Sequence, residues 1–309
     1  MIVAYHAPFT EVACERRPAP LDLEGDCAVN LDRMRAAELG RDTVRILHEG
    51  TYTAPSGRTV DLHEAIARAR AKTQTYPPDR EALLTTHRAH ATEITVTNET
   101  TLTTASRLVA AGVHPVALNF ASARHPCGGF LSGARAQEES LARASALSAC
   151  LNGNPMYDWH ESHRDPFYTD YAIYAPDVPV FREETGALVD EPSLCAFITC
   201  PAVNARVALE RDPGCRPAIC AAMARRIARV LAIAAAHDQA HVILGAWGCG
   251  AFGNDPREIA GLFHAALQGP FRGVFAGVVF AIRDWSSERR FIGPFERAFG
   301  GDQDHDSET

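Results

Sequence analysis

The sequence N-F-A-S-A-R-H-P-C-G-G-F-L-S-G-A-R-A-Q-E-E, from Asn119 to Glu139, connects two segments with different patterns. It begins at the end of Pro115–Phe120, a short apolar run typical of a buried strand. It ends in the first turn of Gln137–Leu151, which has the pattern of a helix. The glycines lie in the connection, where residues without a Cβ let the backbone approach a ligand closely. A strand, a glycine-rich loop and a helix in this order predict one unit of an α/β fold.

The same alternation continues on both sides of this unit. Five further runs indicate strands: Glu93–Val96, Ala172–Tyr174, Ala196–Thr199, His241–Ala246 and Phe275–Ile282. The remaining periodic segments indicate helices: Asn30 to about His48, Asp61–Lys72 starting from an Asp cap, Thr103–Ala111, Arg216–His237 and Pro256–Gln268. We therefore expect an α/β layered fold with helices on both faces of a mostly parallel sheet.

A second unusual segment, G-A-W-G-C-G-A-F-G-N-D-P, begins at Gly245, where another strand is predicted to end. Ligands of such sheets bind at the carboxyl ends of the strands. We expect Asn119–Glu139 and Gly245–Asp255 to form the two halves of one site. The segment contains G-x-G-x-x-G, but only fifty-six residues follow Gly253 and no acidic residue lies about twenty residues on. We therefore expect no NAD cofactor.

Composition narrows the class of protein. Of the 309 residues, 46% are hydrophobic, and 30 Lys plus Arg against 38 Asp plus Glu give a formal charge of −8, so a packed core is expected and long duplex nucleic acid is an unsuitable partner. The nine cysteines include no C-x-x-C pair, so we expect reduced thiols. The N-terminus lacks a signal-peptide pattern, and arginines interrupt the longest apolar stretch. We expect a cytoplasmic monomer with no membrane partner.

Four segments are predicted along the chain. Residues 1–30 show no period and are expected to be a flexible extension. Residues 31–90 are expected to form a helical N-terminal appendage, and 91–299 the main α/β domain. The acidic residues 300–309 are expected to be a disordered tail.

Two adjacent carboxylates, Glu138 and Glu139, lie at the start of the helix that follows the glycine-rich loop. The positive field of a helix N-terminus favours their ionised form unless burial opposes it. Taken alone, they fit an ordinary acidic first turn equally well. Their side chains point about 100° apart on a helix, so we expect separate roles.

The combination P-x-G-G-F-L, a short spacer and Q-E-E resembles the signature of bacterial-type poly(ADP-ribose) glycohydrolases. Similar counterparts exist for G-R-D-T-V-R-I-L near 40, Y-A-P-D-V-P-V-F near 174, I-T-C-P-A-V-N near 198 and the segment at Gly245. The resemblance covers roughly residues 35 to 290. It implies a macrodomain-like three-layer α/β/α fold with a mixed, mostly parallel sheet, and hydrolysis of the ribose–ribose bond of poly(ADP-ribose).

The resemblance also implies the site. Glu139 would protonate the departing oxygen and then activate water, and Glu138 would hold ribose hydroxyls or the adjacent unit. The loop after Gly245 would close over the diphosphate, with Phe252 against the terminal ribose; core packing is nearly as good an interpretation of Phe252. The implied substrate-binding residues are Asn119, Cys127, Gly128, Gly129, Phe130, Gln137, Gly245, Ala246, Gly248, Cys249, Gly250, Ala251 and Phe252. Asn254 or Asp255, just before Pro256, is expected to cap a helix rather than to take part in catalysis.

Cys127 is the main departure, because the family usually has glycine there. Its side chain either intrudes on the ligand or points away, and a nearby helix N-terminus is able to lower its thiol pKa. Two alternatives to chain hydrolysis therefore stay open. One is a mono-ADP-ribosyl hydrolase acting on a nucleobase or a protein side chain, and the other is a catalytically silent ADP-ribose-binding macrodomain.

No metal is expected. His160 and His163 have H-x-x-H spacing, but the zinc-protease helix needs H-E-x-x-H, and solvated loop histidines are the better interpretation. Two C-x4-C pairs, which end at Cys200 and Cys220, fit free buried thiols. The mechanism that the resemblance implies needs no cofactor.

Overall fold

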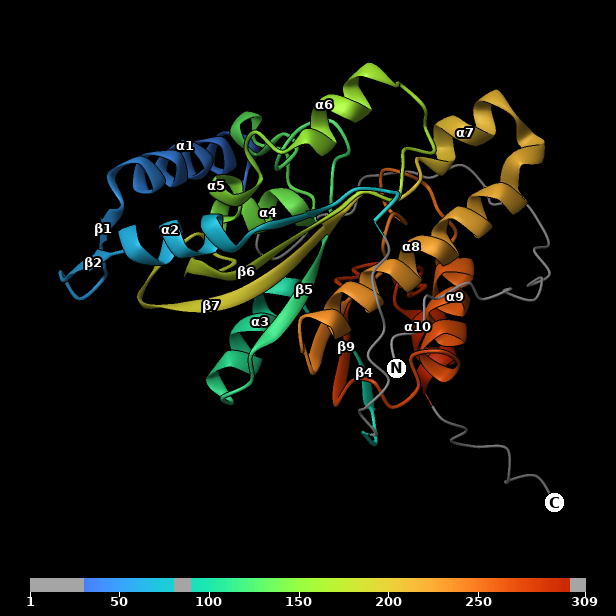
Figure 1. Cartoon of the computed structure of the whole chain (residues 1–309). Coiled ribbons are helices and arrows are strands. Elements are labelled where there is room, and N and C mark those ends of the chain that lie inside the picture. The colour runs from blue at the N-terminus through green and yellow to red at the C-terminus, as the bar shows by residue number, and fades with distance from the viewer. Residues whose placement is uncertain (1–30, 81–89, 301–309) are drawn as a thin grey trace.

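The computed structural model describes residues 31–80 and 90–300 (Figure 1). The predicted flexible extension, residues 1–30, and the predicted tail beyond Gly300 lie outside the described residues.

A seven-stranded sheet forms the centre of the molecule, in the order β3-β6-β7-β5-β8-β9-β4. Its strands are β3 (Gln74–Tyr76), β4 (Glu93–Thr97), β5 (Pro115–Phe120), β6 (Ala172–Arg182), β7 (Leu188–Cys200), β8 (His241–Leu244) and β9 (Gly277–Ala281). Neighbours from β7 to β4 run parallel, whereas β3 and β7 each pair antiparallel with β6. The mixed, mostly parallel sheet is confirmed. A separate small hairpin joins β1 (Thr51–Thr53) to β2 (Thr59–Asp61).

Helices cover both faces of the sheet (Figure 1). One face carries α1 (Arg33–Glu49), α2 (His63–Lys72), α3 (Thr101–Ala110), α4 (Gln137–Ala144), α5 (Leu147–Leu151) and α6 (Pro155–Ser162). The other carries α7 (Ala205–Arg211), α8 (Arg216–Ala236), α9 (Pro256–Gln268) and α10 (Gly293–Phe299). Short 3-10 turns, η1 (Phe130–Ser132) and η2 (Pro213–Cys215), lie in the connections. The expected three-layer arrangement is confirmed.

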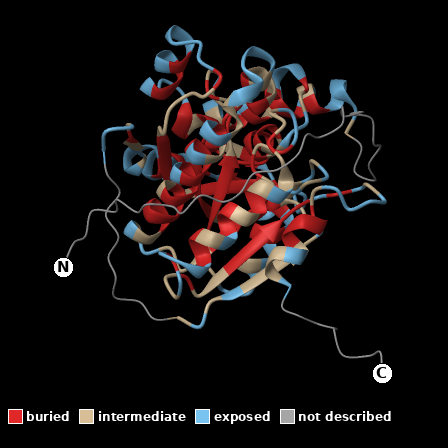
Figure 2. Cartoon of the chain, turned by 90° about the vertical axis from the view of Figure 1, so that its right-hand side faces the viewer, coloured by how far each residue is buried: buried red, intermediate tan, exposed pale blue. Residues whose placement is uncertain are grey.

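The sheet separates two hydrophobic cores, and burial is concentrated along it (Figure 2). On β5, Val116 and Leu118 face the core beneath α8 and α9, whereas Ala117 faces the core beneath α3 and α4. Successive side chains of a strand point to opposite faces. A strand buried on both faces has no polar–apolar alternation, and Pro115–Phe120 is accordingly apolar except at Asn119.

Several element boundaries differ from the sequence prediction. The single helix predicted for Gln137–Leu151 breaks after Ala144, because Ser145 is extended (φ −144°, ψ 174°) and bridges to Val180. β6 and β7 run beyond the predicted Ala172–Tyr174 and Ala196–Thr199 as a long antiparallel hairpin. The predicted Asp cap of α2 is wrong. Leu62 occupies the N-cap, although the carboxylate of Asp61 accepts the N–H of His63 at 2.9 Å.

The described part of the segment predicted as an appendage (31–90), residues 31–80, packs closely on the rest of the chain. Its β3 forms an edge of the main sheet through β6. From α1, Asp42 makes an ion pair with the buried Arg182 of β6, and the Thr43 hydroxyl donates to the carbonyl of Arg143 at 2.6 Å. The division between appendage and catalytic domain stays a prediction.

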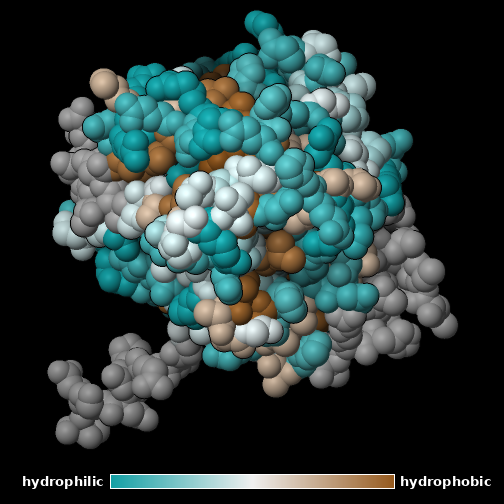
Figure 3. Space-filling view, turned by 90° about the vertical axis from the view of Figure 1, so that its left-hand side faces the viewer, coloured by the Kyte–Doolittle hydropathy of each residue, from teal (hydrophilic) through white to brown (hydrophobic). Residues whose placement is uncertain are grey.

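The stripe predicted for α8 is buried as expected, but its arginines do not all turn away. Arg226 is 1% exposed; its guanidinium reaches Asp170 and donates to the carbonyls of Pro201 and Phe167. The molecular surface is largely hydrophilic on the face shown in Figure 3, with apolar residues gathered in recesses. None of the described helices is both long and apolar enough to cross a membrane.

Candidate active site

One cavity collects residues from both segments that the sequence singled out. β5 and β8 are adjacent and parallel, so the loops after Phe120 and after Leu244 leave the sheet at the same edge. A cavity of about 1440 Å³ lies there, lined on one side by Gln137–Glu139 and on the other by Ala246, Gly248 and 250–252. Both segments line the same cavity, as the sequence predicts for the two halves of one site.

Gln137 fixes the start of α4 to the end of β5. Its side-chain oxygen accepts the N–H of Phe120 at 2.9 Å, and its amide donates to the carbonyl of Leu118 at 2.8 Å and to the Thr101 hydroxyl at 3.1 Å. Every polar atom of this side chain therefore has a protein partner. Gln137 lines the cavity, but these contacts make it a residue that positions the next two glutamates.

Glu138 is 3% exposed, and both of its carboxylate oxygens accept a hydrogen bond. Oε2 accepts the N–H of Ser122 at 2.6 Å, and Oε1 accepts the amide of Asn119 at 3.3 Å. Burial raises the pKa of Glu138 to about 8 and the Glu139 carboxylate adds to the rise, whereas hydrogen bonds from Ser122, Asn119 and the backbone of Cys127 oppose it. Burial thus outweighs the field of the helix N-terminus at this position.

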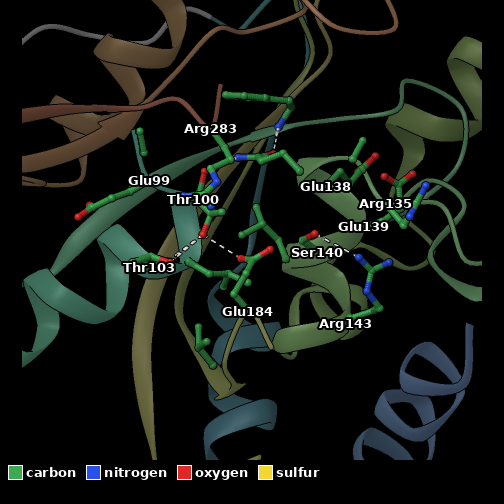
Figure 4. Close-up of a pocket in the computed structure, with 18 of the residues that line it drawn as sticks. Glu99, Thr100, Thr103, Arg135, Glu138, Glu139, Ser140, Arg143, Glu184 and Arg283 are labelled. Atoms are coloured by element: carbon green, nitrogen blue, oxygen red, sulfur yellow. Dashed lines mark hydrogen bonds between the residues drawn. The ribbon is translucent and has the colours of Figure 1, made fainter. Parts of the chain in front are cut away.

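Glu139 is 8% exposed and is held differently. Its Oε1 accepts the N–H of Gly129 at 3.0 Å, whereas Oε2 receives no hydrogen bond from the described residues. Figure 4 shows Glu138 and Glu139 side by side at the start of α4. Among the four carboxylate oxygens of the pair, only Oε2 of Glu139 meets no donor from the described residues, so this oxygen is the one left entirely to another molecule.

The glycine-rich loop wraps around these carboxylates. A Cβ on Gly128 would lie 2.2 Å from Oε1 of Glu139 and 3.2 Å from Oε2 of Glu138. Gly128 also has φ +54°, where side chains are disfavoured. Oxygens of both carboxylates therefore lie close to Gly128, although neighbouring side chains on a helix point about 100° apart.

Cys127 is 0% exposed and packs in the hydrophobic core beneath α4, α5 and α6; it does not line the cavity. Burial, together with the charges of Glu138 and Glu139, raises the pKa of its thiol well above the usual value. The sequence left open whether the thiol intrudes on the ligand or points away. The structure shows that it points away from the cavity, and its pKa is raised rather than lowered. Its φ of +61° is the backbone conformation that glycine adopts most easily.

The loop after β8 lines the cavity with Ala246, Gly248, Gly250, Ala251 and Phe252. The consecutive N–H groups of residues 250–252 donate to no oxygen of the described residues. Runs of unpaired backbone N–H groups are suited to bind anions. This loop is therefore suited to a diphosphate.

The residues behind this loop hold its shape. The buried Asn254 donates to the carbonyls of Val203 and Gly248, at 2.8 and 3.1 Å. Asp255 caps α9 by accepting the N–H of Arg257 at 2.8 Å, which confirms the predicted cap.

Seven residues predicted to bind substrate do not line the cavity: Asn119, Cys127, Gly128, Gly129, Phe130, Gly245 and Cys249. Their contacts show support from behind. Asn119 donates to Glu138 and to Thr199, and Phe130 packs in the core beside α1. Gly245 lies so close to the carbonyl of Ala281 that a Cβ would come within 2.7 Å. Whether any of them contacts substrate stays a prediction.

Further residues that line the cavity were not predicted from the sequence. At one end of the cavity are Glu99, Thr100, Arg283 and Trp285, with the guanidinium of Arg283 3.3 Å from the centre of the Trp285 ring. Thr100 donates to Glu184 at 2.8 Å, so the β6–β7 hairpin closes this end against α3 (Figure 4). Arg124 and Tyr168 also line the cavity, with the Arg124 guanidinium 5.7 Å from the centre of the Tyr168 ring.

The prediction that His160 is a solvated loop histidine is wrong. His160 lies on α6 and is 2% exposed. Its Nδ1 contacts the carbonyl of Ala123 at 3.1 Å and its Nε2 accepts the N–H of Thr169 at 3.1 Å. Among the described residues, no group of three or more His, Cys, Asp and Glu side chains is arranged to hold a metal ion.

Comparison with known proteins places this geometry in a family. The family described as the microbial-type PARG catalytic domain matches residues 40–183. The solved poly(ADP-ribose) glycohydrolase of Thermomonospora curvata is 45% identical with a TM-score of 0.81, over 86% of this chain and 100% of that one.

A second structure of that protein, bound to the inhibitor ADP-HPD, has a TM-score of 0.79 at 45% identity, over 86% of this chain and 100% of that one. The glycohydrolase of Deinococcus radiodurans in complex with ADP-ribose is 40% identical with a TM-score of 0.72, over 75% of this chain and 96% of that one. A comparison with curated protein sequences found no match. The chain belongs to the microbial-type poly(ADP-ribose) glycohydrolase family.

Proposed function

We propose that this protein hydrolyses the ribose–ribose O-glycosidic bond of poly(ADP-ribose) and releases ADP-ribose. The observation that carries the proposal is the carboxylate of Glu139 at the cavity, with one oxygen fixed by Gly129 and the other free of protein donors. Family membership and the ADP-ribose complex of the Deinococcus radiodurans relative support the substrate.

The chemistry needs one residue that both gives and takes a proton. Protonated Glu139 donates its proton to the departing ribose oxygen as the bond from that oxygen to the anomeric carbon breaks, which leaves an oxocarbenium-like sugar. The Glu139 carboxylate then accepts a proton from water as the water oxygen bonds to the anomeric carbon. The products are ADP-ribose and a chain with a free hydroxyl, and Glu139 returns to its protonated form.

The remaining groups orient the sugar and its diphosphate. Glu138, held by Ser122 and Asn119, is positioned to hold ribose hydroxyls. The N–H groups of residues 250–252 are positioned to take the diphosphate, and the ring of Phe252 to pack against the reacting ribose. The burial of both glutamates strengthens these electrostatic contacts by excluding water.

Release of ADP-ribose from modified protein tests the proposal. Purified chain should liberate ADP-ribose from poly(ADP-ribose), and Cys127→Gly should do the same. Release only from singly modified side chains or nucleobases would favour a mono-ADP-ribosyl hydrolase. Binding of ADP-ribose without release from any substrate would favour a silent reader. Both alternatives rested on Cys127, and because its thiol is buried away from the cavity, no observation here favours either of them.

Four finer properties belong to the same proposal. The protein works as a monomer in the cytoplasm, on ADP-ribose chains carried by protein or nucleic acid. Its catalytic domain spans 91–299, preceded by the appendage 31–90. Light scattering of the purified chain and fluorescence microscopy of a tagged chain test the first two properties, and limited proteolysis tests the division at residue 90.

A further inference from the structure

We propose that Arg124 and Tyr168 form a subsite for the second ADP-ribose unit of the chain, the unit that carries the departing oxygen when the terminal unit is released. The subsite would take a nucleoside diphosphate, with its base on the Tyr168 ring and a phosphate on the Arg124 guanidinium. This inference rests on the proposed function.

Both residues border the place where the reacting ribose would lie. Arg124 is two residues after Ser122, whose N–H holds the Glu138 carboxylate and whose hydroxyl oxygen accepts the N–H of Arg124 at 3.4 Å. The Tyr168 ring lies 6.0 Å from the ring of Phe252, and the Arg124 guanidinium lies 5.7 Å from the centre of the Tyr168 ring. The three side chains therefore form one continuous edge of the cavity at its catalytic end.

The Arg124 guanidinium has unused binding capacity. Its Nε is buried and donates to no described residue, and the Glu161 carboxylate is 4.0 Å away. The rest of the cavity lining carries both charges: the carboxylates include Glu99, Glu184 and Glu191, and the guanidinium groups are those of Arg135, Arg143, Arg182 and Arg283. Each unit of the polymer carries two phosphates, so a cation beside the reacting sugar suits a phosphate of the second unit.

Tyr168 is held rigidly in an unfavourable backbone conformation. Its φ is +54°, a region that side chains rarely adopt. The buried His160 contacts the carbonyl of Ala123, which precedes Arg124, and accepts the N–H of Thr169, which follows Tyr168. The buried Arg226 holds Phe167 and Asp170 on both sides of Tyr168. Two buried side chains thus maintain a strained residue at the cavity edge, which is typical of binding sites.

The size of the cavity agrees with a second subsite. Pockets for a single small ligand or cofactor usually measure about 300–1,000 Å³. The cavity here measures about 1440 Å³. Glu99 and Trp285 line this cavity together with Arg124 and Tyr168, and its volume exceeds that of a pocket for one such ligand.

Binding of one-unit and two-unit ligands to Glu139→Gln protein tests the inference without turnover. In calorimetry, a two-unit ADP-ribose fragment should bind more tightly than ADP-ribose. Adding Arg124→Ala or Tyr168→Leu should weaken binding of the two-unit fragment by roughly tenfold, the size expected for losing one stacked base or one phosphate contact, and leave ADP-ribose binding within about twofold. Tyr168→Phe retains the ring and should retain the preference.

The matched control is Arg68→Ala, an exposed arginine on α2 that pairs only with Glu64 at 3.6 Å and should change neither affinity. Melting curves check that each variant is folded. Equal affinity of the parent protein for both ligands, or equal weakening of both by Arg124→Ala, would overturn the subsite. If the wild-type chain releases ADP-ribose from poly(ADP-ribose) but Glu139→Gln binds the one-unit and two-unit ligands equally, only the subsite is overturned. If the chain neither binds ADP-ribose nor releases it, the proposed function is overturned as well.

Discussion

Gly128 and Glu139 fit together so closely that no side chain is possible at residue 128. A Cβ there would lie 2.2 Å from Oε1 of Glu139, the oxygen that the N–H of Gly129 holds at 3.0 Å. The second glycine positions the carboxylate, and the first makes room for it. The glycine pair is therefore part of the catalytic geometry even though neither residue lines the cavity.

Gly128→Ala should abolish most activity. The methyl group displaces the Glu139 carboxylate, and a displacement of about 1 Å in a catalytic group costs roughly a hundredfold in rate. Gly112→Ala is a matched control, because Gly112 has φ +78° but open space around it, so it suffers the backbone strain alone. Rates of ADP-ribose release should fall for Gly128→Ala and stay near the parent rate for Gly112→Ala. Equal rates for the two variants would show that Gly128 does not set the carboxylate position.

Cys127→Gly should leave activity within about twofold, because the thiol packs in the core and does not reach the cavity. Two effects on stability oppose each other. Glycine relieves the backbone at φ +61° but removes a buried side chain, and each effect is on the order of 1 kcal/mol. Denaturation in urea should therefore show a small net change. A large gain in activity would mean that the thiol does restrict the ligand.

Glu138 should make the protein less stable as the pH rises. Its pKa in the folded protein is about 8, against an ordinary value of 4.5. Between these values the folded protein keeps a proton that the unfolded chain has lost. The contribution of Glu138 to the free energy of unfolding is thus full below pH 4.5 and declines as the pH rises toward 8. Glu138→Gln should flatten this part of the melting-temperature profile. An unchanged slope in the variant would contradict the raised pKa.

His160 should act in the opposite direction in acid. Burial lowers its pKa to about 4 from an ordinary value of 6.5. As the pH falls through this window, the unfolded chain binds a proton that the folded protein refuses, so stability declines. His160→Gln should lose that part of the decline, whereas His163→Gln, at an exposed position that stacks on Trp159, should retain it. Identical profiles for both variants would contradict this role of His160.

The sequence was most informative where residues are buried on both sides or constrained by glycine. Pro115–Phe120 and Pro256–Gln268 were predicted with the bounds that the structure has, because a doubly buried strand is a nearly continuous apolar run and a capped amphipathic helix begins at proline. The break at Ser145 was not predictable, since it depends on a bridge to Val180 that lies far along the chain.

The site divides in the same way. The pairing of the Q-E-E helix with the loop after Gly245 was predictable from strand ends, and both segments line the cavity. The direction of the Cys127 side chain depends on a local φ and on the core behind it, neither of which a pattern contains. Arg124 and Tyr168 were missed because tertiary contacts through His160 bring together two loops that share no motif.

Glu139, rather than its neighbour Glu138, performs the proton transfers in the proposed mechanism. The direct measurement is the single-turnover rate of ADP-ribose release from poly(ADP-ribose) by Glu139→Gln, with ADP-ribose affinity measured in the same protein. We predict that the rate falls about a thousandfold, within the range for loss of a general acid and base, while affinity stays within about tenfold of the parent value. Release at the parent rate by Glu139→Gln would show that Glu139 is not the general acid and base.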